Sequence, residues 1–189
     1  MGIFAEFTNA AVGLVKLGPS LDRKQRQEIR DAVGELADEL TRALVLAEAY
    51  LAGAKNSRDS ADLAIYLRDA PNKLMQSFSE YKICGGLYAL EDRFDRVFDP
   101  TRLSVAAGSL GEFRALIQSL SFGERMVIDD LDGLMAKLRG LADELDATAP
   151  GEHDAVRAKI MATMTVEMTR LEDQKKLIKK SMREAFSKM

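Results

Sequence analysis

Residues 113–145, FRALIQSLSFGERMVIDDLDGLMAKLRGLADEL, carry the most regular pattern in the chain. Positions at alternating steps of three and four are apolar, apart from one glutamate. This is the spacing of a helix that buries one stripe of its surface, in a helical bundle or in a coiled coil. The residues of this seam are Phe113, Ile117, Leu120, Glu124, Val127, Leu131, Leu134, Leu138, Leu141 and Leu145.

Two local signals indicate where this helix begins and where its register changes. Ser109 is followed three residues later by Glu112, which is a capping box and predicts that the helix begins at Ser109. Gly123 lies between Phe122 and Glu124. In a single register Phe122 would point outward and Glu124 inward, so we expect either a bend at Gly123 or a contact surface at Phe122.

The same helical period extends through the rest of the chain, and turn residues divide it. One helix is expected over about 20–53, with Ser20 as its N-cap and Gly53 as its end. A second is expected over about 60–98. Pro71 should break or kink it, because proline lacks an N–H and crowds the preceding turn, and the pair Gly85-Gly86 weakens it further.

The last helix is expected to open at Pro150, with Glu152 and Asp154 near its positive end. Its apolar stripe includes Met164, and neighbouring methionines at helical spacing are expected in the core. A shorter helix is expected over residues 2–17. Its apolar face consists of Ile3, Phe4, Phe7, Ala11, Leu14 and Val15.

These segments predict an all-α fold, an antiparallel bundle of four long helices plus a short N-terminal amphipathic helix. Four helices of roughly 35 residues would each be about 50 Å long, and short loops make sequence neighbours antiparallel. We expect a single helical-bundle domain over residues 1–189, with the short helix over 1–17 and the four-helix core over 20–189. The alternative is a coiled-coil dimer, because such seams also close between chains.

Composition limits the compartment and the class of protein. The chain has 189 residues, of which 47% are hydrophobic and 30% charged, with a net charge of -3. This is an ordinary globular balance. No apolar run approaches the roughly 18 residues that a membrane span needs, and the N-terminus lacks the basic region of a signal peptide. A single cysteine fits a reducing compartment, so we expect a cytoplasmic protein.

The sequence offers no catalytic, metal or cofactor constellation. His153 is the only histidine, and a di-iron bundle would need two Glu-x-x-His motifs. Beside Asp154 it is expected at an exposed helix start. Cys84 is expected to be a small core residue, and the acidic clusters around Asp130 and Asp143 to be solvated helix faces. We therefore predict a protein that is not an enzyme and has no cofactor.

Two segments are the candidates for contact with a partner or a membrane. The apolar face of the first helix would either dock on the bundle or insert into a bilayer interface. From Arg170 to Met189 there are seven Lys and Arg against three Asp and Glu, so this tail carries about +4 and the rest of the chain about -7. The candidate contact residues are Phe4, Phe7, Leu14, Phe122, Lys175, Lys176, Lys179, Lys180 and Arg183.

The leading functional hypothesis is a non-enzymatic helical-bundle protein that acts through protein–protein interaction, including self-association to a homo-oligomer. The alternative is a membrane-associating bundle that uses the first helix and the basic tail on an anionic membrane surface. Nucleic acid is disfavoured as a partner, because the rest of the chain is acidic and the tail offers no aromatic stacking platform.

Overall fold

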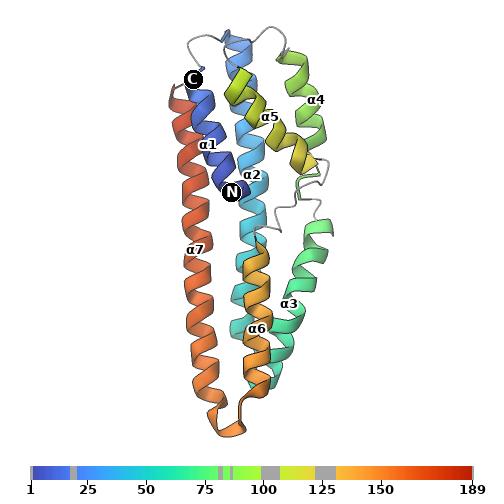
Figure 1. The fold of residues 1–189 in the computed structure, drawn as a ribbon, viewed down its shortest axis with the longest axis vertical. Helices are drawn as coiled ribbons and strands as arrows, with labels where there is room; N and C mark the ends of the chain where they lie inside the picture. The colour runs from blue at the N-terminus through green and yellow to red at the C-terminus, as the bar shows by residue number, and fades with distance from the viewer. Residues whose placement is uncertain are drawn as a thin grey trace. The chain divides into compact units, whose positions relative to one another are not determined.

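The computed structural model describes residues 2–17, 21–80, 83–85, 87–98, 107–121 and 131–188. In these ranges all regular structure is helical, and no residue is in a strand, so the predicted all-α class is confirmed (Figure 1). The α-helices are α1 (Ile3–Val15), α2 (Arg23–Gly53), α3 (Ser60–Glu80), α4 (Leu87–Val97), α5 (Ala107–Ser121), α6 (Asp132–Ala147) and α7 (His153–Lys188). Two short 3-10 helices, η2 (Ala54–Asn56) and η4 (Pro150–Glu152), precede α3 and α7.

The contacts divide the chain into two compact units. Unit 1 comprises Met1–Arg42, Lys82–Val127 and Gln174–Met189, whereas unit 2 comprises Ala43–Tyr81 and Ile128–Asp173. The division falls within α2 and within α7, so each of these helices contributes residues to both units. A single bundle domain over residues 1–189 stays a prediction.

The start of α2 differs from the expected one. Gln25 N–H donates to Asp22 Oδ1 at 2.8 Å, and Asp22 N–H donates to Gln25 Oε1 at 3.1 Å. This reciprocal pair is a capping box, and it starts the helix at Arg23. The predicted cap, Ser20, lies outside the described residues.

The predicted end of α2 at Gly53 is confirmed, but its cause is different. Gly53 has φ -60°, which is ordinary right-handed helix rather than a left-handed C-cap. A Cβ at this position would collide with the hydroxyl of Tyr66. Gly53 therefore allows the backbone of α2 and the Tyr66 ring of α3 to approach closely.

Of the break or kink expected at Pro71, the break is wrong. α3 is one helix from Ser60 to Glu80 with Pro71 inside it, and Pro71 is buried. Proline removes only one helical N–H, and burial of its ring offsets part of that cost. The single helix expected over 60–98 is nevertheless divided, because α3 ends at Glu80 and α4 begins at Leu87. Cys84, in the turn between them, adopts a left-handed φ of 63°.

The predicted helix start at Ser109 is also wrong, since α5 begins at Ala107 and Ser109 lies in its first turn. Ser109 packs against Gly13 of α1 rather than capping the helix. The seam predicted over 113–145 is described as α5 and α6. Phe122, Gly123 and Glu124, and with them the expected bend, lie outside the described residues. The last helix, expected to open at Pro150, is preceded there by the 3-10 helix η4, and α7 itself begins at His153.

In unit 1, α5 packs against both α1 and α4 (Figure 1). The ring of Phe94 in α4 lies 4.6 Å from that of Phe98 and 5.8 Å from that of Phe113 in α5, measured between centroids. Offset aromatic pairs of this kind stabilise a core beyond the area they bury. Fully buried side chains of this unit also include Ile3, Phe7, Leu14, Ile29, Leu36 and Leu40.

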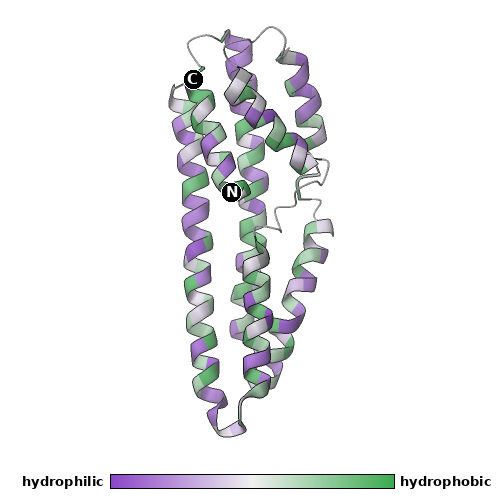
Figure 2. Ribbon diagram, in the orientation of Figure 1, coloured by the Kyte–Doolittle hydropathy of each residue, from purple (hydrophilic) through white to green (hydrophobic). Residues whose placement is uncertain are grey.

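In unit 2, α3 packs along α6. The predicted burial of the α6 seam is confirmed, with Leu131 3%, Leu134 7%, Leu138 4% and Leu141 9% exposed. Figure 2 shows both hydrophobic and hydrophilic residues along the length of α2 and α7, as expected for helices that bury one stripe of their surface. Other buried residues of unit 2 are Leu44, Leu51, Leu63, Leu67, Leu74, Leu145, Ile160, Met164 and Leu171.

Candidate interaction surface

The apolar face of α1 is buried within unit 1. Phe4 is 6% exposed, and Phe7 and Leu14 are fully buried. This confirms that the first helix docks on other helices of the protein, with α5 as its main neighbour. The three side chains therefore form core contacts, and in this arrangement they are not available to a bilayer or to a partner. Phe122, the fourth apolar candidate, lies outside the described residues.

The basic candidates lie on the last turns of α7, in unit 1. Lys176, Lys179, Lys180 and Arg183 are exposed, and we call them the basic face of α7. Lys175 is half-buried. The opposite side of the same turns is core, because Ile178, Ser181 and Ala185 are buried.

Acidic groups pair with only part of this face. Lys180 Nζ lies 3.9 Å from Glu184 Oε1, and the Lys180 side chain is 72% exposed. Lys179 and Arg183 have no acidic partner among the residues that the structure describes. The face therefore keeps an excess of positive charge at the surface.

The end of α7 is held in place by α2. Arg30 donates from its guanidinium to the carbonyl oxygen of Phe186 at 3.2 Å, and the Phe186 ring packs beside Gly34, with 3.7 Å between the ring and a Cβ built on the glycine. A cation at the C-terminus of a helix satisfies an unpaired carbonyl and complements the helix dipole. The two residues are 156 positions apart, so no local signal in the sequence predicts this contact.

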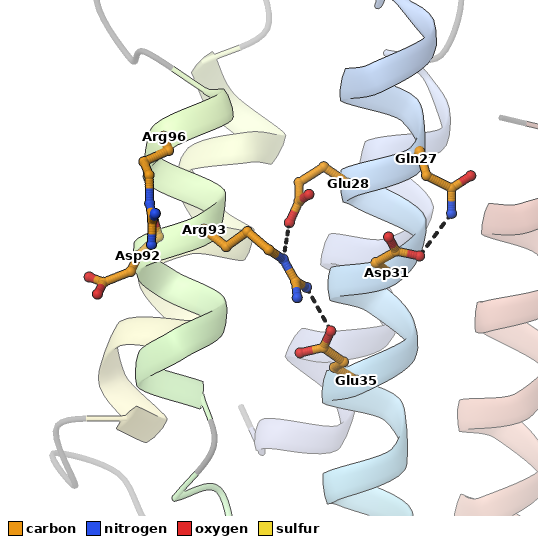
Figure 3. Close-up of polar contacts among 7 residues, drawn as sticks. All are labelled: Gln27, Glu28, Asp31, Glu35, Asp92, Arg93 and Arg96. Atoms are coloured by element: carbon orange, nitrogen blue, oxygen red, sulfur yellow. Dashed lines mark hydrogen bonds and ion pairs between the residues drawn. The ribbon is translucent and has the colours of Figure 1, made fainter.

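A second charged surface lies where α4 faces α2 (Figure 3). Arg93 donates from Nε to Glu28 and from its terminal nitrogen to Glu35 Oε1 at 2.6 Å. Hydrogen bonds to Glu35 and Glu28 raise the pKa of Arg93. Asp92 and Arg96 of α4 point away from α2 in the same view. The fork of Arg93 thus ties the two helices together.

Other acidic groups of α2 do not take part in this fork. Asp31 instead accepts a 2.8 Å hydrogen bond from the Gln27 amide (Figure 3). Asp38 is exposed and has no ionic partner in the described part of the chain. We call Asp31, Glu35 and Asp38 the acidic face of α2. The acidic face was not among the surfaces predicted from the sequence, although the i, i+4 and i+7 spacing of its residues is the signal that reveals it.

Unit 2 contains a cleft of about 550 Å³, and several of its polar side chains have structural roles. Asp59 Oδ1 accepts the Asp62 N–H at 2.8 Å and caps α3, and Arg157 donates to the Ser57 carbonyl. His153 Nε2 lies 2.9 Å from the Thr148 carbonyl oxygen. The lining residues are Arg58, Asp59, Ser60, Ala61, Leu145, Asp146, His153, Asp154 and Arg157.

The remaining candidate chemical groups are also structural. Cys84 is 7% exposed, as predicted for a core residue, and its burial and the nearby Glu39 carboxylate raise the pKa of the thiol to about 12. Its backbone N–H donates to Glu39 Oε2 at 2.8 Å. Asp143 is exposed on α6. Within the described ranges, no cluster of histidine, cysteine and acidic residues has the arrangement of a metal site.

None of the described helices combines the length and the apolar composition needed to cross a membrane. No protein-family model, curated protein or solved structure matches the chain.

Proposed function

We propose that this chain is a non-enzymatic helical protein that acts by binding an acidic protein partner through the basic face of α7. The observation that carries the proposal is the exposed set Lys176, Lys179, Lys180 and Arg183 on two turns of one helix, in which Lys179 and Arg183 have no acidic partner among the described residues. Cationic side chains on a rigid helix steer and orient an acidic surface without a deep pocket. We place this activity in the cytoplasm, in line with the single buried Cys84.

Burial of α1 favours a protein partner over a bilayer. A membrane-inserting helix would first have to expose Phe4, Phe7 and Leu14, which are in the core of unit 1. At about 25 cal/mol per Å² of apolar area, separating three such side chains from the core costs several kcal/mol. Leu177, 44% exposed, is the only large apolar side chain exposed on the described part of α7 in unit 1.

The test is a titration of the full chain with a labelled helical peptide that carries Glu at positions i, i+4 and i+7, followed by fluorescence anisotropy. We expect binding at low salt. The charge-reversed variant K176E/K180E/R183E should bind at least about tenfold more weakly, because each lost exposed ion pair is worth about 0.2–1 kcal/mol and the new charges repel. The matched control K24E/K55E/R139E reverses three other exposed cations and should bind like the wild type.

Two parallel titrations separate the other partner classes. Vesicles of phosphatidylserine and phosphatidylcholine test an anionic membrane, and a DNA duplex tests nucleic acid. Binding of either probe without binding of the peptide would overturn the proposal. Equal weakening in the control variant would also overturn it, because the effect would then reflect net charge rather than the basic face.

A further inference from the structure

We infer that the acidic partner is a second copy of this chain, and that the basic face of α7 binds the acidic face of α2 on that copy. The inference rests on the proposed function, which requires only an acidic protein surface. Here the surface is identified as Asp31, Glu35 and Asp38, three exposed residues in unit 1.

The acidic face has a defined geometry. Asp31 and Asp38 are seven residues apart, which is two helical turns, so they project in nearly the same direction about 10 Å apart. The Gln27 amide that binds Asp31 is neutral and leaves its charge intact. Asp38 has no ionic partner among the described residues. Glu35 is shared with Arg93, so the two aspartates carry most of the uncompensated charge.

The basic face of α7 repeats this geometry with the opposite sign. Lys176, Lys180 and Arg183 occupy positions i, i+4 and i+7, the same spacing as Asp31, Glu35 and Asp38. Two straight helices with these spacings bring opposite charges together over two turns. A parallel pairing aligns all three positions, and an antiparallel pairing offsets only the middle one by a single residue.

The two faces do not neutralise each other within one copy. α2 and α7 are neighbours in unit 1 through Arg30, Gly34 and Phe186. However, all six residues of the matched faces are exposed, and in the described part of the chain Asp31, Glu35 and Asp38 make no ion pair with the basic face. A second copy supplies both complementary surfaces at once. Contacts made only by exposed charges are weak and strongly screened by salt, so we expect a dimer that dissociates as ionic strength rises.

The test is sedimentation equilibrium of the full chain at low salt, with two charge-reversed variants. The first, K176E/K180E/R183E, makes both faces acidic. The second, D31K/D38K, makes both faces basic and leaves Glu35 in place for Arg93. We expect the wild type to self-associate, and each variant alone to remain monomeric. Mixed in equal amounts, the two variants should form a heterodimer, because each again meets a surface of opposite charge.

The controls separate this inference from misfolding and from net charge. K24E/K55E/R139E should self-associate like the wild type, and far-UV circular dichroism should show unchanged helix content in every variant. A wild type that stays monomeric at low salt, or a mixture of variants that does not associate, would overturn the second-copy assignment. If such a protein still binds the acidic helical peptide, the proposed function stands and only the identity of the partner is wrong.

Discussion

Gly13 of α1 lies directly against Ser109 of α5, so that a Cβ built on the glycine would stand 2.7 Å from the Ser109 Oγ and 3.0 Å from its Cβ. The missing side chain lets the two helices approach and bury the apolar face of α1. Because that burial removes Phe4, Phe7 and Leu14 from the surface, one glycine bears directly on which surfaces the protein presents.

Replacing Gly13 with valine should lower the free energy of unfolding by about 1–3 kcal/mol, the usual cost of overpacking a close contact. Chemical denaturation measures it. The matched control is Gly140→Ala on α6, where nothing lies within 4 Å of the added Cβ. There the free energy of unfolding should rise by up to about 1 kcal/mol, because alanine is the better helix former. Equal effects at the two positions would contradict the close approach at Gly13.

Leu134→Ala should lower the free energy of unfolding by about 2–5 kcal/mol, since truncation of a buried leucine removes apolar contacts and leaves a cavity. Leu134 is 7% exposed in the core of unit 2. Ile65→Ala on α3 is the control, because Ile65 is 59% exposed and should change the stability by less than about 0.5 kcal/mol. A urea melt with a loss below about 1 kcal/mol for Leu134→Ala would mean that this seam is not a packed core.

The buried thiol of Cys84 should make the free energy of unfolding fall at alkaline pH. Burial, reinforced by the Glu39 carboxylate, raises the pKa of its thiol from an ordinary 9.0 to about 12. The folded state therefore holds a proton that the unfolded chain releases above pH 9.0. The stability contributed by the neutral, buried thiol is fully present below pH 9.0. It is lost as the pH rises toward about 12.

The measurement is the difference in unfolding free energy between the wild type and Cys84→Ala from pH 8 to 11. Above the unfolded pKa, the wild type should lose up to about 1.4 kcal/mol per pH unit relative to the variant. Lysine and tyrosine residues titrate in both proteins, so their effect cancels when the two unfolding free energies are subtracted. A constant difference across this range would show that the thiol is not held in its neutral form.

Arg93→Met should weaken unit 1 by about 1 kcal/mol, because methionine keeps the aliphatic stem but cannot donate to Glu28 and Glu35. The value is modest because the Arg93 side chain is 42% exposed and its ion pairs are partly screened. A double-mutant cycle with Glu28→Gln should give a coupling energy of about 0.5 kcal/mol or more. A coupling near zero would mean that the fork observed in Figure 3 does not stabilise the fold.

Local patterns in the sequence were sufficient to predict several features. Apolar residues at steps of three and four predicted helices and the burial of Leu131, Leu134, Leu138 and Leu141. The end of α2 at Gly53 and the turn at Pro150 before α7 were also predictable. These features depend on backbone propensity and on which side of a helix is apolar. Both are set by residues within a few helical turns of one another in the sequence.

Tertiary structure decided that α3 continues through Pro71 and which charges meet. Burial of Leu67 and Leu74 on either side of Pro71 offsets the lost hydrogen bond and the crowding of the preceding turn. The chain interrupts its helix instead around Cys84, where a left-handed residue and the Glu39 hydrogen bond hold a turn. Arg30 and Phe186, like Arg93 and Glu35, meet across long separations in sequence, and only packing selects such partners. The sequence by itself determined the helices and their buried sides, whereas the continuity of α3 through Pro71 and the long-range partners of Arg30 and Arg93 arose from folding, because contact energies between distant segments outweigh local propensities.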